Sequence, residues 1–142
     1  MEWIYEWKGA VTAVLAGLTA LWGWFGWLVL LWLCCLLFDY ITGSLAAARR
    51  GEWSSATARE GIWHKLGSIV AVMVAAGADV LLSVVIGQLP EAPLSYSSFL
   101  CPLVVVWYTL TELGSITENA VRLGAPVPEF LRKALKIPEK FS

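Results

Sequence analysis

A long apolar stretch near the N-terminus limits what this chain can fold into. Between residues 9 and 48 the only charged side chain is Asp39. One helical crossing of a bilayer takes about 20 residues, so this stretch allows one crossing with a large remainder, or two crossings if the chain turns back. Two further apolar stretches follow at residues 66–86 and 97–120. The sequence therefore predicts an all-α integral membrane protein.

The composition argues against several classes of function. Hydrophobic residues make up 58% of the chain and the formal net charge is −1, which suggests neither nucleic acid nor an acidic soluble partner. The 3 cysteines lie in apolar stretches, where thiols act as small buried hydrophobes. The single histidine, His64, follows Trp63 and is interpreted as an interfacial residue. Because no nucleophile, metal or phosphate motif is present, we expect no enzyme, no catalytic residue, no metal and no cofactor.

The number of crossings depends on how the first apolar stretch is divided. Gly23 and Gly26 lie within a cluster of aromatic residues. Aromatic side chains favour the membrane–water interface and glycine permits a tight turn, so a hairpin is predicted here. It would give about four transmembrane helices, the first two at residues 7–24 and 27–48. The alternative is three crossings preceded by an N-terminal interfacial helix.

Basic residues predict the orientation. The segment 49–65 and the chain after residue 121 are rich in Lys and Arg, whereas segment 87–98 has none. Basic loops stay on the cytoplasmic side, so segment 87–98 is predicted to face outward. Four crossings place both termini inside, while three crossings would place Lys8 outside.

The last residues are predicted to form a separate tail. We expect a transmembrane helical domain at residues 1–124 and a cytoplasmic basic tail at residues 125–142. Pro128 suits the first position of a short C-terminal amphipathic helix. Its basic face is predicted to bind the membrane surface through Arg132, Lys133 and Lys136. A solvated basic tail is the alternative.

Acidic residues inside the apolar stretches carry the most chemical information. Asp39 and Asp79 lie near the expected midplane and Glu112 not far from it, with no Lys or Arg expected at the same depth. An acid facing lipid costs about 2.5–3.5 kcal/mol on insertion-based scales. We therefore expect these acids to face one another, another copy of the chain, or water.

Small and polar residues recur at helical spacing beside these acids, and small residues let helices approach closely in lipid. The predicted oligomerisation and pore surface comprises Asp39, Gly43, Ala47, Ala71, Ala75, Asp79, Ser83, Glu112, Ser115 and Asn119. The alternative is that the acids are protonated and hydrogen-bonded inside a compact monomer.

Four segments resemble a known family, the toxin secretion and phage lysis holins, which includes the clostridial toxin-release holin. Residues 39–47 are similar to its Asp-x-x-Thr-Gly signature, and residues 54–65 resemble its Ser-Ser, Gly-hydrophobic and Lys pattern. Residues 112–119 resemble its Glu-x-x-Ser-Ile-x-Glu-Asn segment, and residues 123–135 its Leu-Gly-x-x-x-Pro tail. Thr111 departs from the family, which often has Asn there, and the N-terminus matches no motif.

The resemblance implies a holin that forms homo-oligomers in the bacterial cytoplasmic membrane. Such a protein opens lesions that release a phage endolysin, or a toxin, for host lysis. Its expected partners are membrane lipid, further copies of itself and the released endolysin, with an antiholin as a further candidate. Two other classes stay open: a small ion or proton channel or transporter subunit, and a non-conducting antiholin-like regulator.

Overall fold

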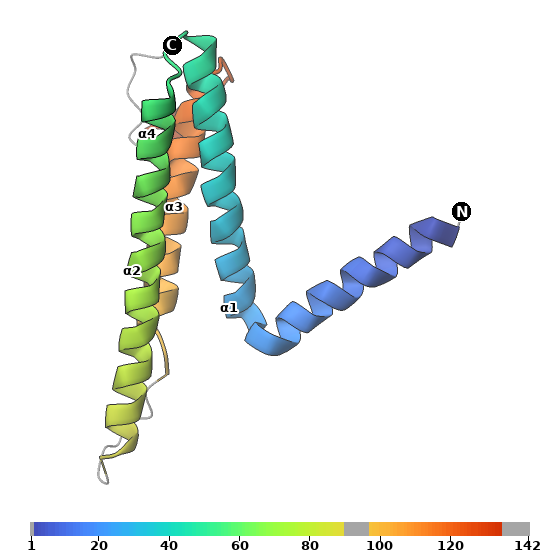
Figure 1. Ribbon diagram of the computed structural model, residues 1–142, viewed down its shortest axis with the longest axis vertical. Helices are drawn as coiled ribbons and strands as arrows, with labels where there is room; N and C mark the ends of the chain where they lie inside the picture. The colour runs from blue at the N-terminus through green and yellow to red at the C-terminus, as the bar shows by residue number, and fades with distance from the viewer. Residues whose placement is uncertain (1, 90–96, 135–142) are drawn as a thin grey trace.

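The computed structural model describes residues 2–89 and 97–134, which form helices α1 (Glu2–Arg49), α2 (Ser55–Gly87), α3 (Leu100–Arg122) and α4 (Glu129–Ala134) (Figure 1). No strand occurs in these two ranges. By length and composition three helices are candidates to cross a membrane: Gly23–Arg49, Ser55–Gly87 and Leu100–Arg122. The predicted all-helical fold is confirmed, with three candidate crossings among the described residues.

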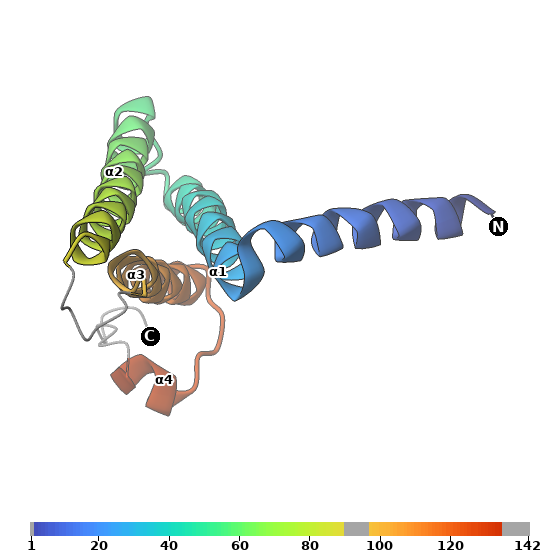
Figure 2. The ribbon, with the colours of Figure 1, turned by 90° about the horizontal axis from the view of Figure 1, so that it is seen from below.

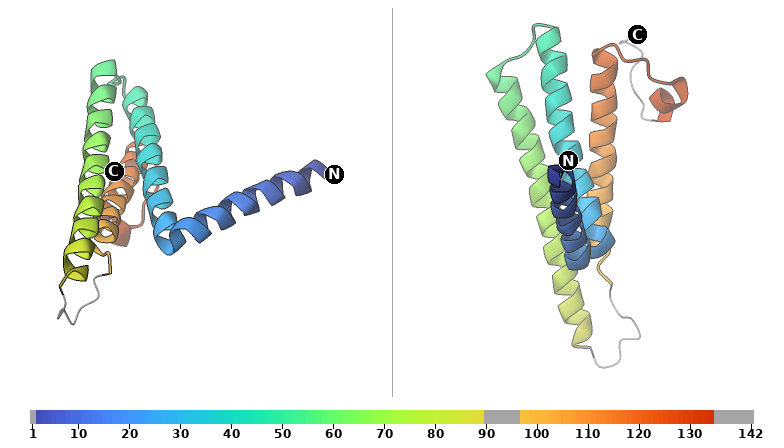
Figure 3. Two further views of the ribbon diagram at one scale, coloured as in Figure 1. Left: turned by 60° about the horizontal axis from the view of Figure 1, so that its bottom comes forward. Right: turned by 90° about the vertical axis from the view of Figure 1, so that its right-hand side faces the viewer.

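Helix α1 bends at Gly23. The backbone of Gly23 has φ 56° and ψ −146°, a conformation that glycine adopts without a Cβ clash. The N-terminal half of α1 points away from the other helices instead of folding back against them (Figures 1 and 3). Trp27 Nε1 donates a hydrogen bond to Thr19 Oγ1 at 2.8 Å, which joins the two halves across the bend. The break lies where the aromatic cluster predicts it, but it is a bend at one residue, and the half before Gly23 is not among the three candidate crossings.

Helix α3 lies at the centre of the bundle. It packs along the second half of α1 and against α2, whereas α1 and α2 contact each other less (Figure 2). The buried core consists of Trp32 and Leu36 from α1, Val72 from α2, and Cys101 and Val105 from α3. Most other large apolar side chains are exposed, as helices that face lipid require.

Local sequence explains where α2 begins. Ser54 has an extended backbone, and its Oγ accepts a hydrogen bond from the Thr57 N–H at 3.1 Å. This is an N-cap, which satisfies one of the N–H groups that a helix start leaves without a partner. Gly51 takes a φ of 70° in the turn before it. The Ser-Ser pair of the motif therefore starts α2 early, and residues up to Lys65 belong to the helix.

The described part of the tail contains the short helix α4. Helix α4 starts directly after Pro128 and lies on the side of α3 away from α1 and α2 (Figure 2). Lys133 forms an ion pair with Glu129 at 2.8 Å, and Arg132 is half-buried. Lys136 lies outside the described residues. Membrane-surface binding by an amphipathic helix in this tail stays a prediction.

Candidate functional site

Three charged side chains from three helices meet inside the bundle. Lys65 Nζ on α2 lies 2.8 Å from Asp39 Oδ2 on α1 and 2.6 Å from Glu112 Oε2 on α3. The side chains of Lys65, Asp39 and Glu112 are 17%, 16% and 11% exposed. We call this group the ion cluster. Through the ion cluster, Lys65 of α2 contacts both α1 and α3, so that all three candidate crossings are connected.

The expectation that no basic residue lies at the depth of the acids is wrong for Asp39 and Glu112. Lys65 was assigned to the basic loop, but the helix that begins at Ser55 carries it about 15 Å along its axis. There it donates hydrogen bonds to both carboxylates. Two buried carboxylates close together need such a cation, because an uncompensated buried charge is costly.

Asn119 extends the ion cluster. Its Nδ2 donates to Asp39 Oδ1 at 3.0 Å and lies 3.3 Å from Thr42 Oγ1. A Cβ built on Gly43 would lie 3.3 Å from the same nitrogen, so a side chain there would require Asn119 to shift by a few tenths of an ångström. The Asp-x-x-Thr-Gly signature on α1 is thus the surface against which the buried Asn119 of α3 packs.

Asp79 serves a different contact. Its Oδ1 accepts from the Leu100 N–H at 3.1 Å and its Oδ2 from the Cys101 N–H at 2.7 Å. These are N–H groups of the first turn of α3, where a negative charge also opposes the positive end of the helix dipole. Asp79 is 3% exposed and lies about 21 Å along α2 from Lys65. The acids therefore separate into the ion cluster and a cap that α2 provides for α3.

The remaining small and polar residues of the predicted surface lie in varied surroundings. Ala75 is half-buried against the core, and Ser83 is exposed near the end of α2. The others are all half-buried: Ala47, Ala71 and Ser115. A role of any of these residues between copies stays a prediction.

A pocket leads from the α1–α2 loop to the ion cluster. It has a volume of about 280 Å³, and its lining includes Asp39 and Lys65 at one end and Arg50, Trp53 and Arg122 at the other. A space of this size is large enough for water molecules, and Asp39, Arg50 and Lys65 could serve as their hydrogen-bond partners. The pocket thus gives the ion cluster an opening toward the α1–α2 loop. In the described ranges no group of three or more His, Cys, Asp or Glu side chains is placed to hold a metal ion.

Sequence reasoning found Asp39, Glu112 and Asn119 but missed Lys65 and the capping role of Asp79. The signal for Lys65 was the N-cap at Ser54, because a helix that starts there carries Lys65 into the bundle. No comparable signal in the sequence predicts that Asp79 caps α3, since Asp79 contacts α3 only through tertiary packing.

These features define an α-helical membrane protein whose candidate crossings are joined by a buried ion cluster. Residues 16–140 match the bacteriophage holin family, and the chain belongs to that family.

Relatives from bacteria are described as uncharacterized proteins. One from Halalkalibacterium halodurans is 34% identical over 137 residues, covering 96% of this chain and 95% of that protein. One from Listeria monocytogenes is 33% identical over 110 residues, or 78% and 70% of the two chains. One from Clostridium perfringens is 29% identical over 136 residues, or 91% and 93%. No solved structure matches the chain.

Proposed function

We propose that this protein is a holin that forms homo-oligomers in a bacterial cytoplasmic membrane and opens lesions for an endolysin. The match of residues 16–140 to the bacteriophage holin family carries this proposal. A toxin is the alternative cargo, and an antiholin that restrains the assembly is a further partner that the proposal allows.

The geometry of the protomer supports accumulation before opening. The acids of the apolar stretches are hydrogen-bonded within one copy, through the ion cluster and through the cap on α3. A single copy therefore inserts without exposing these charges to lipid, which would otherwise cost several kcal/mol. The same groups can supply polar surface, and the pocket at the α1–α2 loop opens toward Asp39 and Lys65.

A finer topology belongs to the proposal. The half of α1 before Gly23 reaches about 32 Å when helical, close to the thickness of the hydrocarbon core, with Glu2, Glu6 and Lys8 at its N-terminal end. We assign it to a fourth crossing, which places both termini on the cytoplasmic side. An N-terminal helix lying in the interface is the alternative, and it would place Lys8 outside.

The proposed function is tested by inducing this chain in a bacterium together with a cytoplasmic endolysin that lacks its own export signal. We expect respiration to stop abruptly and the cells to lyse, while the endolysin alone leaves them intact. Ion-selective currents without enzyme release would replace the holin by a channel. Intact cells in which a second holin acts later would replace it by a regulator.

A further inference from the structure

Two hollows lie on the outside of the bundle, each with a volume of about 450 Å³. The first lies between α2 and α3 over Gly67, with Trp63 and Tyr108 in its walls. The second lies between α3 and α4 over Gly114, with Trp107 in its wall. A Cβ built on either glycine meets no atom within 4 Å. Each hollow therefore has a glycine floor that is open to a side chain from outside.

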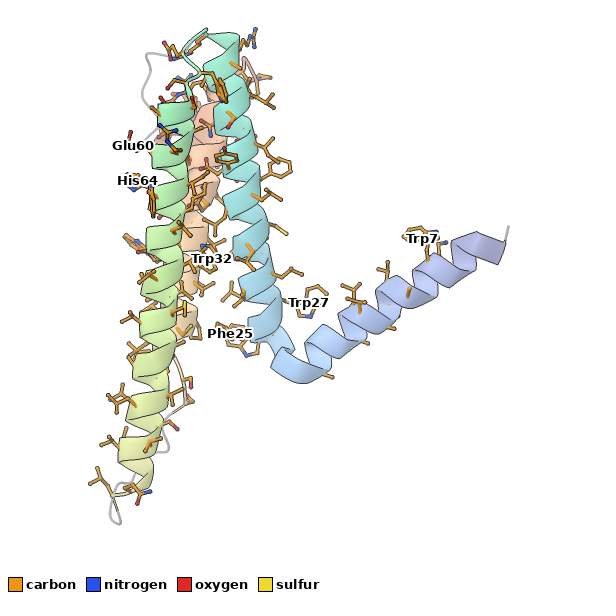
Figure 4. The ribbon with its side chains drawn as sticks, viewed as in Figure 1. Trp7, Phe25, Trp27, Trp32, Glu60 and His64 are labelled. Atoms are coloured by element: carbon orange, nitrogen blue, oxygen red, sulfur yellow. The ribbon has the colours of Figure 1, made fainter. Side chains whose placement is uncertain are left out.

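Each hollow is bordered by a tryptophan that its own copy leaves exposed. Trp63 is 68% exposed and Trp107 is 69% exposed. Beside Trp63, Glu60 and His64 project from α2 away from α1 (Figure 4). Indole N–H groups seek a hydrogen-bond partner when they leave water, and ionisable groups at membrane depth pair or face water. A polar partner surface would therefore stabilise these side chains in the membrane.

The contacts inside one copy give the relative heights of the two hollows. Lys65 on α2 meets Glu112 on α3, and further along Asp79 on α2 meets the start of α3. Helices α2 and α3 run antiparallel between these two contacts. With a rise of about 1.5 Å per residue, Trp63 and Gly114 both lie about 3 Å from the level of the ion cluster, on the side of the α1–α2 loop.

The other pair of residues lies on the opposite side of that level. Gly67 is about 3 Å and Trp107 about 8 Å from it, a difference of less than one helical turn. Copies inserted in the same orientation share one level in the membrane. The tryptophan of each hollow therefore comes to the height of the glycine of the other.

We propose that copies of this chain associate head to tail, with the α2 face of one against the α3 face of the next. Trp63 enters the hollow over Gly114 of the neighbour, and the neighbour's Trp107 enters the hollow over Gly67. The inference rests on the proposed homo-oligomer and adds the faces that meet. Two different patches make this contact heterologous, so it repeats into rings or open arrays.

The polar groups of the two faces are complementary. Trp63 brings an indole donor, and the hollow that receives it is lined by hydroxyl and carboxylate acceptors of Thr111, Ser115 and Glu118. Glu60 comes close to the height of Glu118, whose partner Arg122 lies 3.9 Å away. In the proposed contact the Arg122 guanidinium faces the carboxylate of Glu118 and that of Glu60 from the neighbouring copy.

Cysteine cross-linking in membranes tests the contact. The three native cysteines are replaced by alanine, and His64→Cys and Thr111→Cys are placed on copies with different tags. We expect an oxidative cross-link between the two tags and little within either variant alone. The control pair combines His64→Cys with Leu103→Cys. Leu103 is exposed on α3, but it lies about 15 Å further from the α1–α2 loop, along the bundle axis, than His64. Equal cross-linking of both pairs, or cross-links only between identical variants, would overturn the proposal.

A second variant keeps the proposal testable if the cysteine-free background folds poorly. Gly114→Leu fills a hollow, and its Cβ meets no atom of its own copy within 4 Å; Gly87→Leu adds the same side chain where a Cβ on α2 also meets nothing. We expect Gly114→Leu to lower the population of large oligomers in membranes at least tenfold and Gly87→Leu to leave it unchanged. Equal oligomer sizes for both variants would contradict the assigned faces.

The two levels of the proposal fail separately. Lysis with endolysin but no cross-link between His64→Cys and Thr111→Cys would reject the faces and leave the holin function. A full cross-link in cells that retain a co-expressed endolysin would reject the holin function and leave the faces.

Discussion

Lys65 is the residue on which the interior of the bundle depends. It neutralises one of two carboxylates that lie on different helices, and its Nζ contacts both. Removing one partner of a buried ion pair costs more than the pair contributes, because a charge is left in a medium of low dielectric constant. Loss of any one member of the cluster would therefore destabilise the packing of α1, α2 and α3 against one another.

Lys65→Met should lower the free energy of unfolding in detergent by about 3–5 kcal/mol, since Asp39 and Glu112 would then face each other without a cation. The measurement is a thermal or denaturant unfolding curve of the purified protein. Combining Lys65→Met with Asp39→Asn and Glu112→Gln removes all three charges and should restore most of the loss. If Lys65→Met were as stable as the parent, Lys65 would not stabilise the folded protein through Asp39 and Glu112.

Asp79 gives a second test at the same scale. Asp79→Asn removes the charge and one of the two oxygens that accept from Leu100 and Cys101. We expect a loss of about 1–2 kcal/mol, the usual range for a helix N-cap in a buried setting. Ser83→Ala, an exposed change one turn further along α2, serves as the control and should have no effect. Equal stability of the two variants would refute the capping role.

At the scale of the helices, the sequence predicts some features and not others. The position of the break at Gly23, where a hairpin was predicted and a bend is found, and the inward position of Glu112 and Asn119 follow from glycine and helical spacing. These are local signals. The position of Lys65 within α2 was not predicted, because the arginines in segment 49–65 indicated a basic loop.

The contact between α1 and α3 is also a helix-scale feature with a clear test. Gly43→Leu should weaken it by about 1–3 kcal/mol, the cost of overpacking, because the Cβ alone already comes within 3.3 Å of Asn119 Nδ2. Gly77→Leu is the matched control, since a Cβ there meets nothing within 4 Å. Thermal unfolding in detergent gives the comparison. Identical curves for the two variants would show that Asn119 does not sit on Gly43.

At the scale of the whole molecule, the bundle holds Asp39, Lys65, Asp79 and Glu112 between its helices and shows mainly apolar surface to the outside. Apolar periodicity predicts that architecture, since exposed Leu and Val side chains cover α2 and α3. The direction of the N-terminal half of α1 follows from no such pattern. It depends on one backbone conformation at Gly23 and on the Trp27–Thr19 hydrogen bond, labelled at Trp27 in Figure 4.

Cysteine labelling from outside the cell tests the proposed topology. The distribution of Lys and Arg predicts that Gln88→Cys reacts with an impermeant maleimide in intact spheroplasts, and that Glu52→Cys reacts only after the membrane is opened. With a fourth crossing, Lys8→Cys should behave like Glu52→Cys, because both then lie inside. Labelling of Lys8→Cys in intact spheroplasts would leave three crossings and an N-terminal half of α1 at the outer surface. Labelling of Glu52→Cys there would reverse the orientation of the whole bundle and place the pocket that leads to the ion cluster on the outside.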